Sequence, residues 1–220
     1  LLRNRVMRAL VPSLAILILA AAPVASQQFT TLKGHGGPIM DIAVSEETGR
    51  VATASFDNSV GVWESRSPKW LEGHDAAVNT VLFMGEKRLA SAADDFVILL
   101  WDLTKGFGTR LEGHKGKVMG LALSPDGETL ASASWDGTVG LWPMGAEQPQ
   151  FLDGHEAPVN AVAFGQNGQL YSASADGTIR IWDIESGNHR VLMDQGFGIN
   201  RLVIEPDKGW LAYGAVDGVT

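Results

Sequence analysis

Short apolar stretches recur along this chain, and turns that contain Gly, Asp or Asn separate them. Residues 78–83, 118–123 and 159–164 carry apolar residues on both faces, a pattern typical of strands that are covered on both sides. Each is followed by a stretch of small residues, such as 130–134, and then by a stretch that ends in Trp. We expect paired β-strands in each group, with the strands that are apolar on both faces innermost.

An internal repeat organises these strands. Gly-His occurs at 34–35, 73–74, 113–114 and 154–155, and a Trp follows each His by 27 or 28 residues. The intervals between successive histidines are 39, 40 and 41 residues. At this period each unit is one four-stranded sheet that must stack on its neighbours to bury its faces. The sequence therefore predicts an all-β fold, a β-propeller.

A turn signal lies six residues before each Trp. The turns begin at Asp57, Asp95, Asp136 and Asp176, and the following residues are Asn58, Phe96, Gly137 and Gly177. Asp-Gly and Asp-Asn tolerate the positive φ angles of a two-residue hairpin. Three of the four turns have the expected chemistry, and Phe96 is the exception.

With these features in register, the chain resembles the Trp-Asp (WD) repeat β-propellers. Trp101-Asp102 and Trp182-Asp183 keep the pair that gives the family its name, whereas Trp63-Glu64 and Trp142-Pro143 depart from it. The resemblance covers nearly everything after about residue 28 and implies a partial propeller over 27–220. Its repeats start near residues 34, 73, 113, 154 and 194: four are complete and the fifth is partial.

Members of this family typically close with seven blades, so the resemblance implies that the chain is a fragment of such a ring. Residues 29–32 resemble the outer strand that completes the last blade in this family. We expect an open array of blades with an exposed edge at the fifth unit, which favours aggregation or pairing.

The resemblance also implies a buried, hydrogen-bonded tetrad of His, Ser, Asp and Trp in each repeat. The expected members are His35, Ser55, Asp57 and Trp63; His114, Ser134, Asp136 and Trp142; and His155, Ser174, Asp176 and Trp182. The second repeat supplies His74, Asp95 and Trp101 but has Ala93 where the hydroxyl belongs, so Trp101 is expected to lack its partner.

A Ser, a His and an Asp close together also match a catalytic triad. A hydrolase builds its nucleophile once, however, whereas this set occurs three times at one spacing, which favours a structural role. The remaining histidine, His189, lies in a polar stretch and is interpreted as a solvated loop residue. The chain has no Cys, no His-x-x-x-His, no phosphate loop and no calcium loop. We therefore expect no enzymatic activity, catalytic residue, cofactor or metal.

Two sets of positions are expected to form a protein-binding face. In this family, one face presents the residue before each turn Asp and the residue just inside each inner strand. Here these are Phe56, Asp94, Trp135, Ala175 and Val216, together with Met40, Asn79, Met119, Asn160 and Asn200. The large apolar members would form a patch rimmed by Asn and Asp, a composition typical of interfaces. The alternative is that Trp135 and Phe56 pack over adjacent blades; Trp70 and Trp210 are interpreted as packing residues.

The N-terminus has the three-part layout of a secretory signal peptide over residues 1–26. Three arginines precede an apolar stretch from Ala9 to Ala22, and small residues follow. About 14 core residues fall short of the roughly 20 that a spanning helix needs, so we expect cleavage rather than stable membrane insertion. Export predicts a bacterial periplasmic location.

Charge bears on the choice of partner. Loss of the three signal-peptide arginines would take the formal charge from −8 to −11, which argues against nucleic acid as a ligand. The sequence thus favours an exported protein-interaction scaffold. The alternative is the propeller module of a periplasmic redox protein with a c-type cytochrome domain beyond residue 220, whose sign would be a Cys-x-x-Cys-His motif. A hydrolase that uses the propeller funnel ranks behind both.

Overall fold

The computed structural model describes residues 31–145, 148–205 and 209–216. These residues form strands and turns, with no helix among them. The chain divides into two compact units, Leu1–Thr31 and Leu32–Thr220, and the account below concerns the second. The predicted signal peptide and residues 29–30 of the expected outer strand 29–32 lie outside the described residues, and residues 31–32 are not in a strand.

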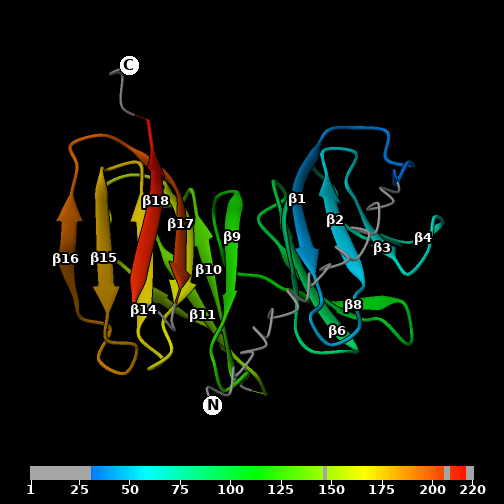
Figure 1. Ribbon diagram of the computed structural model, residues 1–220. Helices are drawn as coiled ribbons and strands as arrows, with labels where there is room; N and C mark the ends of the chain where they lie inside the picture. Colours follow the sequence, from blue (N-terminus) through cyan, green and yellow to red (C-terminus); the bar gives the residue numbers. More distant parts are fainter. Residues whose placement is uncertain (1–30, 146–147, 206–208, 217–220) are drawn as a thin grey trace, which may run out of the picture. The chain divides into compact units, whose positions relative to one another are not determined.

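Four sheets of four antiparallel strands follow one another along the chain (Figure 1), and each is called a blade here. Blade 1 consists of β1 (Ile39–Val44), β2 (Val51–Ser55), β3 (Ser59–Trp63) and β4 (Pro68–Glu72). Blade 2 consists of β5 (Val78–Phe83), β6 (Arg88–Ala93), β7 (Ile98–Asp102) and β8 (Phe107–Leu111). Blade 3 consists of β9 (Val118–Leu123), β10 (Thr129–Ser134), β11 (Val139–Pro143) and β12 (Gln150–Leu152). Blade 4 consists of β13 (Val159–Phe164), β14 (Leu170–Ser174), β15 (Thr178–Trp182) and β16 (His189–Asp194).

Blade 5 has two described strands, β17 (Ile199–Glu205) and β18 (Trp210–Ala215). Strand order within each blade follows the sequence, as expected for hairpin-connected antiparallel strands. No strand pairing among the described residues joins blade 5 to blade 1. The prediction of an all-β propeller with four complete repeats and a partial fifth is confirmed.

The hydrophobic core lies between blades. One cluster joins Val60 of blade 1 to Val81 of blade 2, and the next joins Ile98 of blade 2 to Val118 of blade 3. Two further clusters join blade 3 to blade 4 and blade 4 to blade 5. Each blade therefore gains its apolar burial from its neighbours, which is the physical reason for the repeat.

Hydrogen bonds also join successive blades near the start of their inner strands. Asn79 Nδ2 donates to the carbonyl of Val118 at 3.2 Å, and Asn160 Nδ2 donates to that of Ile199 at 2.9 Å. Both bonds connect residues 39 positions apart. Because the start of one inner strand bonds the start of the next, the turns that precede these strands lie at the same end of successive blades.

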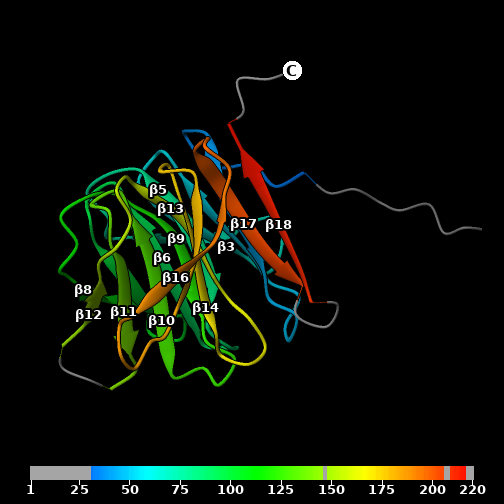
Figure 2. The ribbon, with the colours of Figure 1, turned by 90° about the vertical axis from the view of Figure 1, so that its left-hand side faces the viewer.

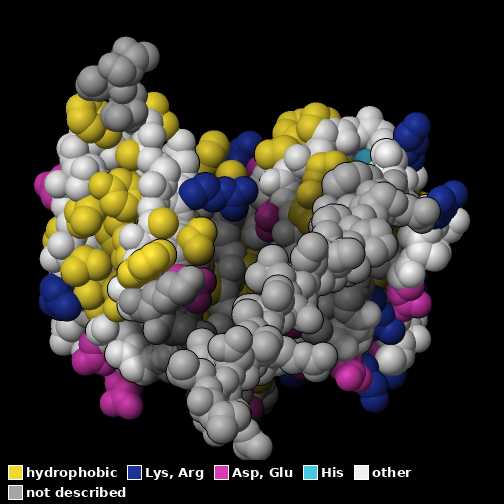
Figure 3. Space-filling view, in the orientation of Figure 1, with side chains coloured by type: hydrophobic (Ala, Val, Ile, Leu, Met, Phe, Trp, Pro, Cys, Tyr) yellow, Lys and Arg dark blue, Asp and Glu magenta, His cyan; other side chains and the backbone are white. Residues whose placement is uncertain are grey.

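The first and last blades expose apolar surface that the middle blades bury. Val81 of β5 is 4% exposed, whereas Ile42, at the same position of β1, is 60% exposed. Val203 of β17 is 63% exposed, and among the described strands only β17 pairs with β18 (Figure 2). Hydrophobic side chains gather over β17 and β18 in the space-filling view (Figure 3). The expected exposed edge at the fifth unit is present.

Candidate protein-interaction face and the networks beneath it

A buried hydrogen-bond network repeats in blades 1 to 4. In each, the Trp indole N–H donates to a hydroxyl, and Nε2 of the His lies within hydrogen-bond distance of the same hydroxyl oxygen. The hydroxyls belong to Thr53, Ser91, Ser132 and Ser172, at 2.9, 2.8, 2.8 and 2.7 Å from the indole nitrogens and 2.7, 2.8, 2.7 and 2.7 Å from Nε2. The assignment of Ser55, Ser134 and Ser174 to this role is wrong. The expectation that Trp101 lacks a partner is also wrong, because Ser91 supplies the hydroxyl.

Strand register explains the correction. In each blade the hydroxyl residue pairs with the residue two positions before the Trp, which lies on the same face as the Trp. The pairs are Thr53–Gly61, Ser91–Leu99, Ser132–Gly140 and Ser172–Arg180. A Cβ atom on Gly140 would lie 2.5 Å from Ser132 Oγ and 2.9 Å from Trp142 Nε1, so in blade 3 the network packs directly against this glycine. A sequence signal was present, since the Trp of each of the four complete repeats has a hydroxyl residue ten positions before it, whereas the position eight before it has Ala93 in the second repeat.

Ser55, Ser134 and Ser174, which were expected in the network, form other hydrogen bonds. Ser134 Oγ accepts the backbone N–H of Asp136 at 3.1 Å and donates to the carbonyl of Gly116 at 3.1 Å. Ser55 and Ser174 make equivalent bonds. These hydroxyls tie the hairpin turn to the loop that precedes the inner strand. Blade 2 lacks this bond because Ala93 has no hydroxyl.

The Asp carboxylates define the direction of the proton network. Burial by itself raises the pKa of Asp176, but hydrogen bonds from Thr178 and His155 outweigh it and bring the pKa to about 2. The same balance lowers the pKa of Asp95, where hydrogen bonds from His74 and the backbone of Asp75 overcome burial. An ionised carboxylate only accepts, so Nδ1 of each His donates to it and Nε2 accepts from the hydroxyl.

A catalytic triad has the same chain of hydrogen bonds, from hydroxyl to His and from His to Asp. Burial of the hydroxyl distinguishes a structural role from a catalytic one. Ser91, Ser132 and Ser172 are 0% exposed, and each oxygen already accepts an indole N–H. A nucleophile needs room for a reacting atom beside the hydroxyl. The closed surroundings favour the structural interpretation of the network.

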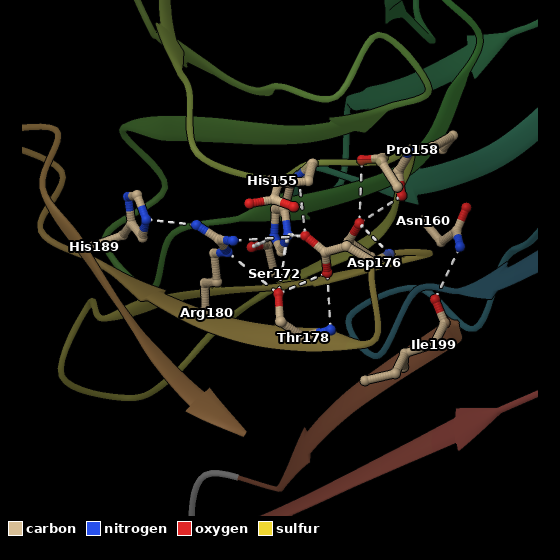
Figure 4. Close-up of polar contacts among 12 residues, drawn as sticks. His155, Pro158, Asn160, Ser172, Asp176, Thr178, Arg180, His189 and Ile199 are labelled. Atoms are coloured by element: carbon tan, nitrogen blue, oxygen red, sulfur yellow. Dashed lines mark hydrogen bonds and ion pairs between the residues drawn. The ribbon is translucent and has the colours of Figure 1, made fainter. Parts of the chain in front are cut away.

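Blade 4 carries an unusual extension of the network (Figure 4). Arg180 occupies the position that Gly61 and Gly140 hold in blades 1 and 3, and it is 8% exposed. Its guanidinium donates to Thr178 Oγ1 at 3.2 Å and to His189 Nε2 at 2.5 Å, and lies 3.6 Å from Asp176 Oδ2.

The interpretation of His189 as a loop residue is therefore wrong, although its expected exposure to solvent is confirmed. His189 begins β16, and its ring lies 4.7 Å from that of Trp182. Burial lowers its pKa, and the neighbouring charge of Arg180 lowers it further. Sequence reasoning missed this pair because nothing near His189 in sequence indicates Arg180.

A β-bulge places the second residue of every inner strand. The register of each first hairpin shifts at Met40, Asn79, Met119, Asn160 and Asn200. Bulges redirect a side chain out of the normal alternation. The residue before each turn Asp lies at the same end, because its N–H bonds the loop before the inner strand, as Trp135 does to Lys117 at 2.8 Å. We call these two sets of residues the turn face.

Some turn-face residues are exposed and could contact a partner, whereas others are buried and bond the next blade. Phe56 is 55%, Trp135 45% and Met40 37% exposed, whereas Asn79 is only 5% exposed. Asn79 does not form a polar rim, because its amide bonds the next blade and Asp94. The prediction that Asn79 belongs to the exposed polar rim of an apolar patch is thus wrong. Asn160 faces inward in part, toward Ile199 (Figure 4).

Trp135 is held from both sides and still exposed. Its indole N–H donates to Asn160 Oδ1 at 3.0 Å, and Lys117 Nζ lies 5.3 Å from the ring centre. Lys117 also donates to Asp94 Oδ2 at 2.5 Å. A direct bond to blade 4, and Lys117 of the loop before β9, which is itself bound to Asp94 of blade 2, therefore fix the orientation of a blade 3 side chain. The two interpretations of Trp135 hold together: it contacts an adjacent blade and presents surface.

No group of three or more residues suited to bind a metal ion occurs within the described part of the chain. Over the same residues, no helix has the length and apolar character needed to cross a membrane.

These sheets and networks define a β-propeller built from homologous blades. The family model described as "WD domain, G-beta repeat" matches residues 26–64, 66–102, 107–143 and 146–183, which is more than half of the chain. The chain belongs to the WD40 repeat family. It is also similar to a solved structure of the WD40 β-propeller domain of Doa1, with a TM-score of 0.75 and 27% identity, covering 84% of this chain and 63% of that one.

Curated relatives match shorter parts of the chain. Nuclear distribution protein nudF 1 of Talaromyces marneffei is 34% identical over 106 residues, which is 44% of this chain and 23% of the relative. Protein tipD of Dictyostelium discoideum is 34% identical over 90 residues, 40% of this chain and 15% of the relative. Autophagy-related protein 16 of Arabidopsis thaliana is 29% identical over 163 residues, 71% of this chain and 24% of the relative. The chain thus spans less than a quarter of the length of these relatives, all of which are eukaryotic.

Proposed function

We propose that this chain is a protein-interaction scaffold that binds its partner through the turn face, with Trp135 as the central anchor. WD40 propellers generally mediate protein–protein interaction, which supports the class of function. The observation that carries the assignment to this face is the exposed, fixed indole of Trp135.

Preorganisation makes Trp135 suited to this role. A side chain that is already held by Asn160 and Lys117 loses little rotamer freedom when a partner covers it. Trp is among the residues most enriched at binding hot spots, where truncation to Ala costs at least about 2 kcal/mol. Phe56 and Met40 of blade 1 add exposed apolar area to the same face. The partner is therefore a protein that offers an apolar segment.

Site-specific photo-crosslinking in the native cells tests this function. A photoreactive phenylalanine analogue is placed at Phe56, on the turn face, or at the exposed Glu64, beyond the end of β3 and away from the turns. We expect position 56 to capture a discrete protein that position 64 does not, and Trp135→Ala to abolish that crosslink. Equal capture at both positions, or capture that survives Trp135→Ala, would contradict the proposal.

The cellular location is a separate part of the proposal. The layout of residues 1–26 supports export, and the acidic composition supports a protein rather than a nucleic acid as partner. Fusion of residues 1–40 to an alkaline phosphatase that folds only outside the bacterial cytoplasm is expected to give an active enzyme. Deletion of residues 9–22 from that fusion should abolish the activity. An inactive full fusion would overturn the export proposal and leave the binding face untouched.

The redox alternative also has a direct test. A c-type cytochrome module would give the product of the complete gene a haem absorption band and a downstream Cys-x-x-Cys-His motif. We expect a colourless product, as the scaffold proposal requires. A haem band would favour the alternative, with this propeller as its docking module.

A further inference from the structure

The hairpin turn of blade 2 contains a strained aromatic residue. Phe96 has a φ of +71°, in the left-handed region that a bulky side chain avoids. The equivalent residues of the other turns are Asn58, with a φ of +71°, Gly137 at +89° and Gly177 at +85°. Asn and Gly are the residues that tolerate this conformation. Phe96 is therefore the one residue of the four that conflicts with its own backbone.

The fold does not compensate for this strain. Phe96 is 42% exposed and belongs to none of the four hydrophobic clusters of the described residues. Its backbone N–H bonds the carbonyl of Ala93, as Gly137 and Gly177 do in their turns, so the aromatic ring adds nothing to that bond. Strain that the packing does not require occurs most often where a residue serves function.

The repeat places the Phe96 side chain beside the loop that supports Trp135. A Cβ atom on Gly137 would face the carbonyl oxygens of His155 and Ala157 in the next blade, at 3.8 and 3.9 Å. The residues equivalent to this pair in blade 3 are His114 and Gly116. By this equivalence the Cα–Cβ bond of Phe96 is directed toward residues 114–116, and Lys117, which follows them in the same loop, contacts both Trp135 and Asp94.

We propose that Phe96 is a second aromatic anchor of the turn face, and that the partner places an apolar side chain against Phe96 and Trp135 with a carboxylate beside it. The carboxylate would meet Lys115, which is exposed and belongs to the same loop as Lys117; its backbone N–H donates to Asp136, the residue after Trp135, at 2.9 Å. Lys117 is already engaged by Asp94, which leaves Lys115 as the cation of this loop that is available to a ligand. This inference rests on the proposed function and names the chemistry that the partner must carry.

Phage-displayed random 12-residue peptides supply a defined probe. Peptides are selected on the wild-type chain, those that also bind Trp135→Ala are removed, and the affinities of the survivors are measured by calorimetry. We expect the survivors to pair an apolar residue with Asp or Glu. Phe96→Gly should weaken their binding at least about tenfold, and Lys115→Glu by a similar factor, because hot-spot truncations cost this much or more.

Stability separates binding from folding in the same variants. Phe96→Gly relieves the strained φ, so it should raise the melting temperature by about 2–4 °C while it weakens binding. Asn58→Gly, at the same turn position of blade 1, is the matched control, and it should leave peptide affinity unchanged. A lower melting temperature for Phe96→Gly would show that the ring stabilises the fold and would overturn the inference.

The remaining outcomes distinguish this inference from the function on which it rests. Peptides that depend on Trp135 but bind Phe96→Gly at wild-type affinity would overturn the role of Phe96 and leave the turn face intact. Peptides that bind Lys115→Glu as tightly as the wild type would overturn the acidic partner. A library that yields no Trp135-dependent peptide would count against the proposed function itself.

Discussion

The buried hydroxyl of Ser91 provides the sharpest test of the repeated network. Ser91 is 0% exposed, and its oxygen lies 2.8 Å from both Trp101 Nε1 and His74 Nε2. Ser91→Ala leaves the indole N–H without an acceptor and Nε2 without a donor. Each buried polar group that loses its partner costs about 1–3 kcal/mol, so the two together should lower the free energy of unfolding by about 2–6 kcal/mol.

A double-mutant cycle with Trp101→Phe assigns that loss. Phe keeps most of the ring but has no N–H, so in this background Ser91→Ala harms only the bond to His74. The cost of Ser91→Ala should then fall by about 1–2 kcal/mol. Urea unfolding of the four proteins, followed by circular dichroism, measures the difference. A cost of Ser91→Ala below about 0.5 kcal/mol, or an equal cost in both backgrounds, would refute the network in blade 2.

Three further predictions follow from the same structure. Ala93→Ser should stabilise the chain by about 0.5–1.5 kcal/mol in urea unfolding, because it supplies the turn-to-loop bond that the other three complete blades have; a loss of stability would contradict this. His189 has a pKa below its ordinary 6.5 in the folded chain, so the unfolded chain binds the proton more readily, and stability should fall as the pH drops through 6.5 toward the folded pKa. His189→Phe should reduce that fall in melts across this range, and an unchanged pH profile would exclude the pair with Arg180 as its source. Ile42→Lys should reduce self-association of the isolated chain in sedimentation velocity, since Ile42 is 60% exposed where its equivalents pack between blades; an unchanged distribution would exclude this surface as the cause.

The fold could be predicted because the sequence features that specify one blade occur in four consecutive repeats. The intervals between Gly-His pairs, the turn Asp and the Trp specify one blade, and repetition excludes accidental matches. The inner strands, the hairpins and the exposed edge at blade 5 follow from these features. The fold can be predicted from such a sequence because the local patterns of strands and turns agree with the global architecture.

The site was harder to predict because it depends on register and on contacts between blades. Ser132 and Ser134 lie on the same face of β10, so alternation alone could not tell which one faces the indole. Asn79 resembled a surface residue, but the bulge directs its amide to the next blade. Arg180 of β15 meets His189 of the neighbouring strand β16, at a position where blades 1 and 3 have Gly and blade 2 has Leu99.

Hydrogen exchange of the chain, alone and bound to the protein captured at position 56, tests the central claim most directly. The account predicts slower exchange in segments 38–42, 56–58, 94–97, 115–119 and 135–138, which contain turn-face residues and the loops beside them, and unchanged exchange in the outer strands β8 and β12. Protection confined to the outer strands, with the turns unchanged, would show that the partner binds elsewhere and would contradict the turn face as the functional site.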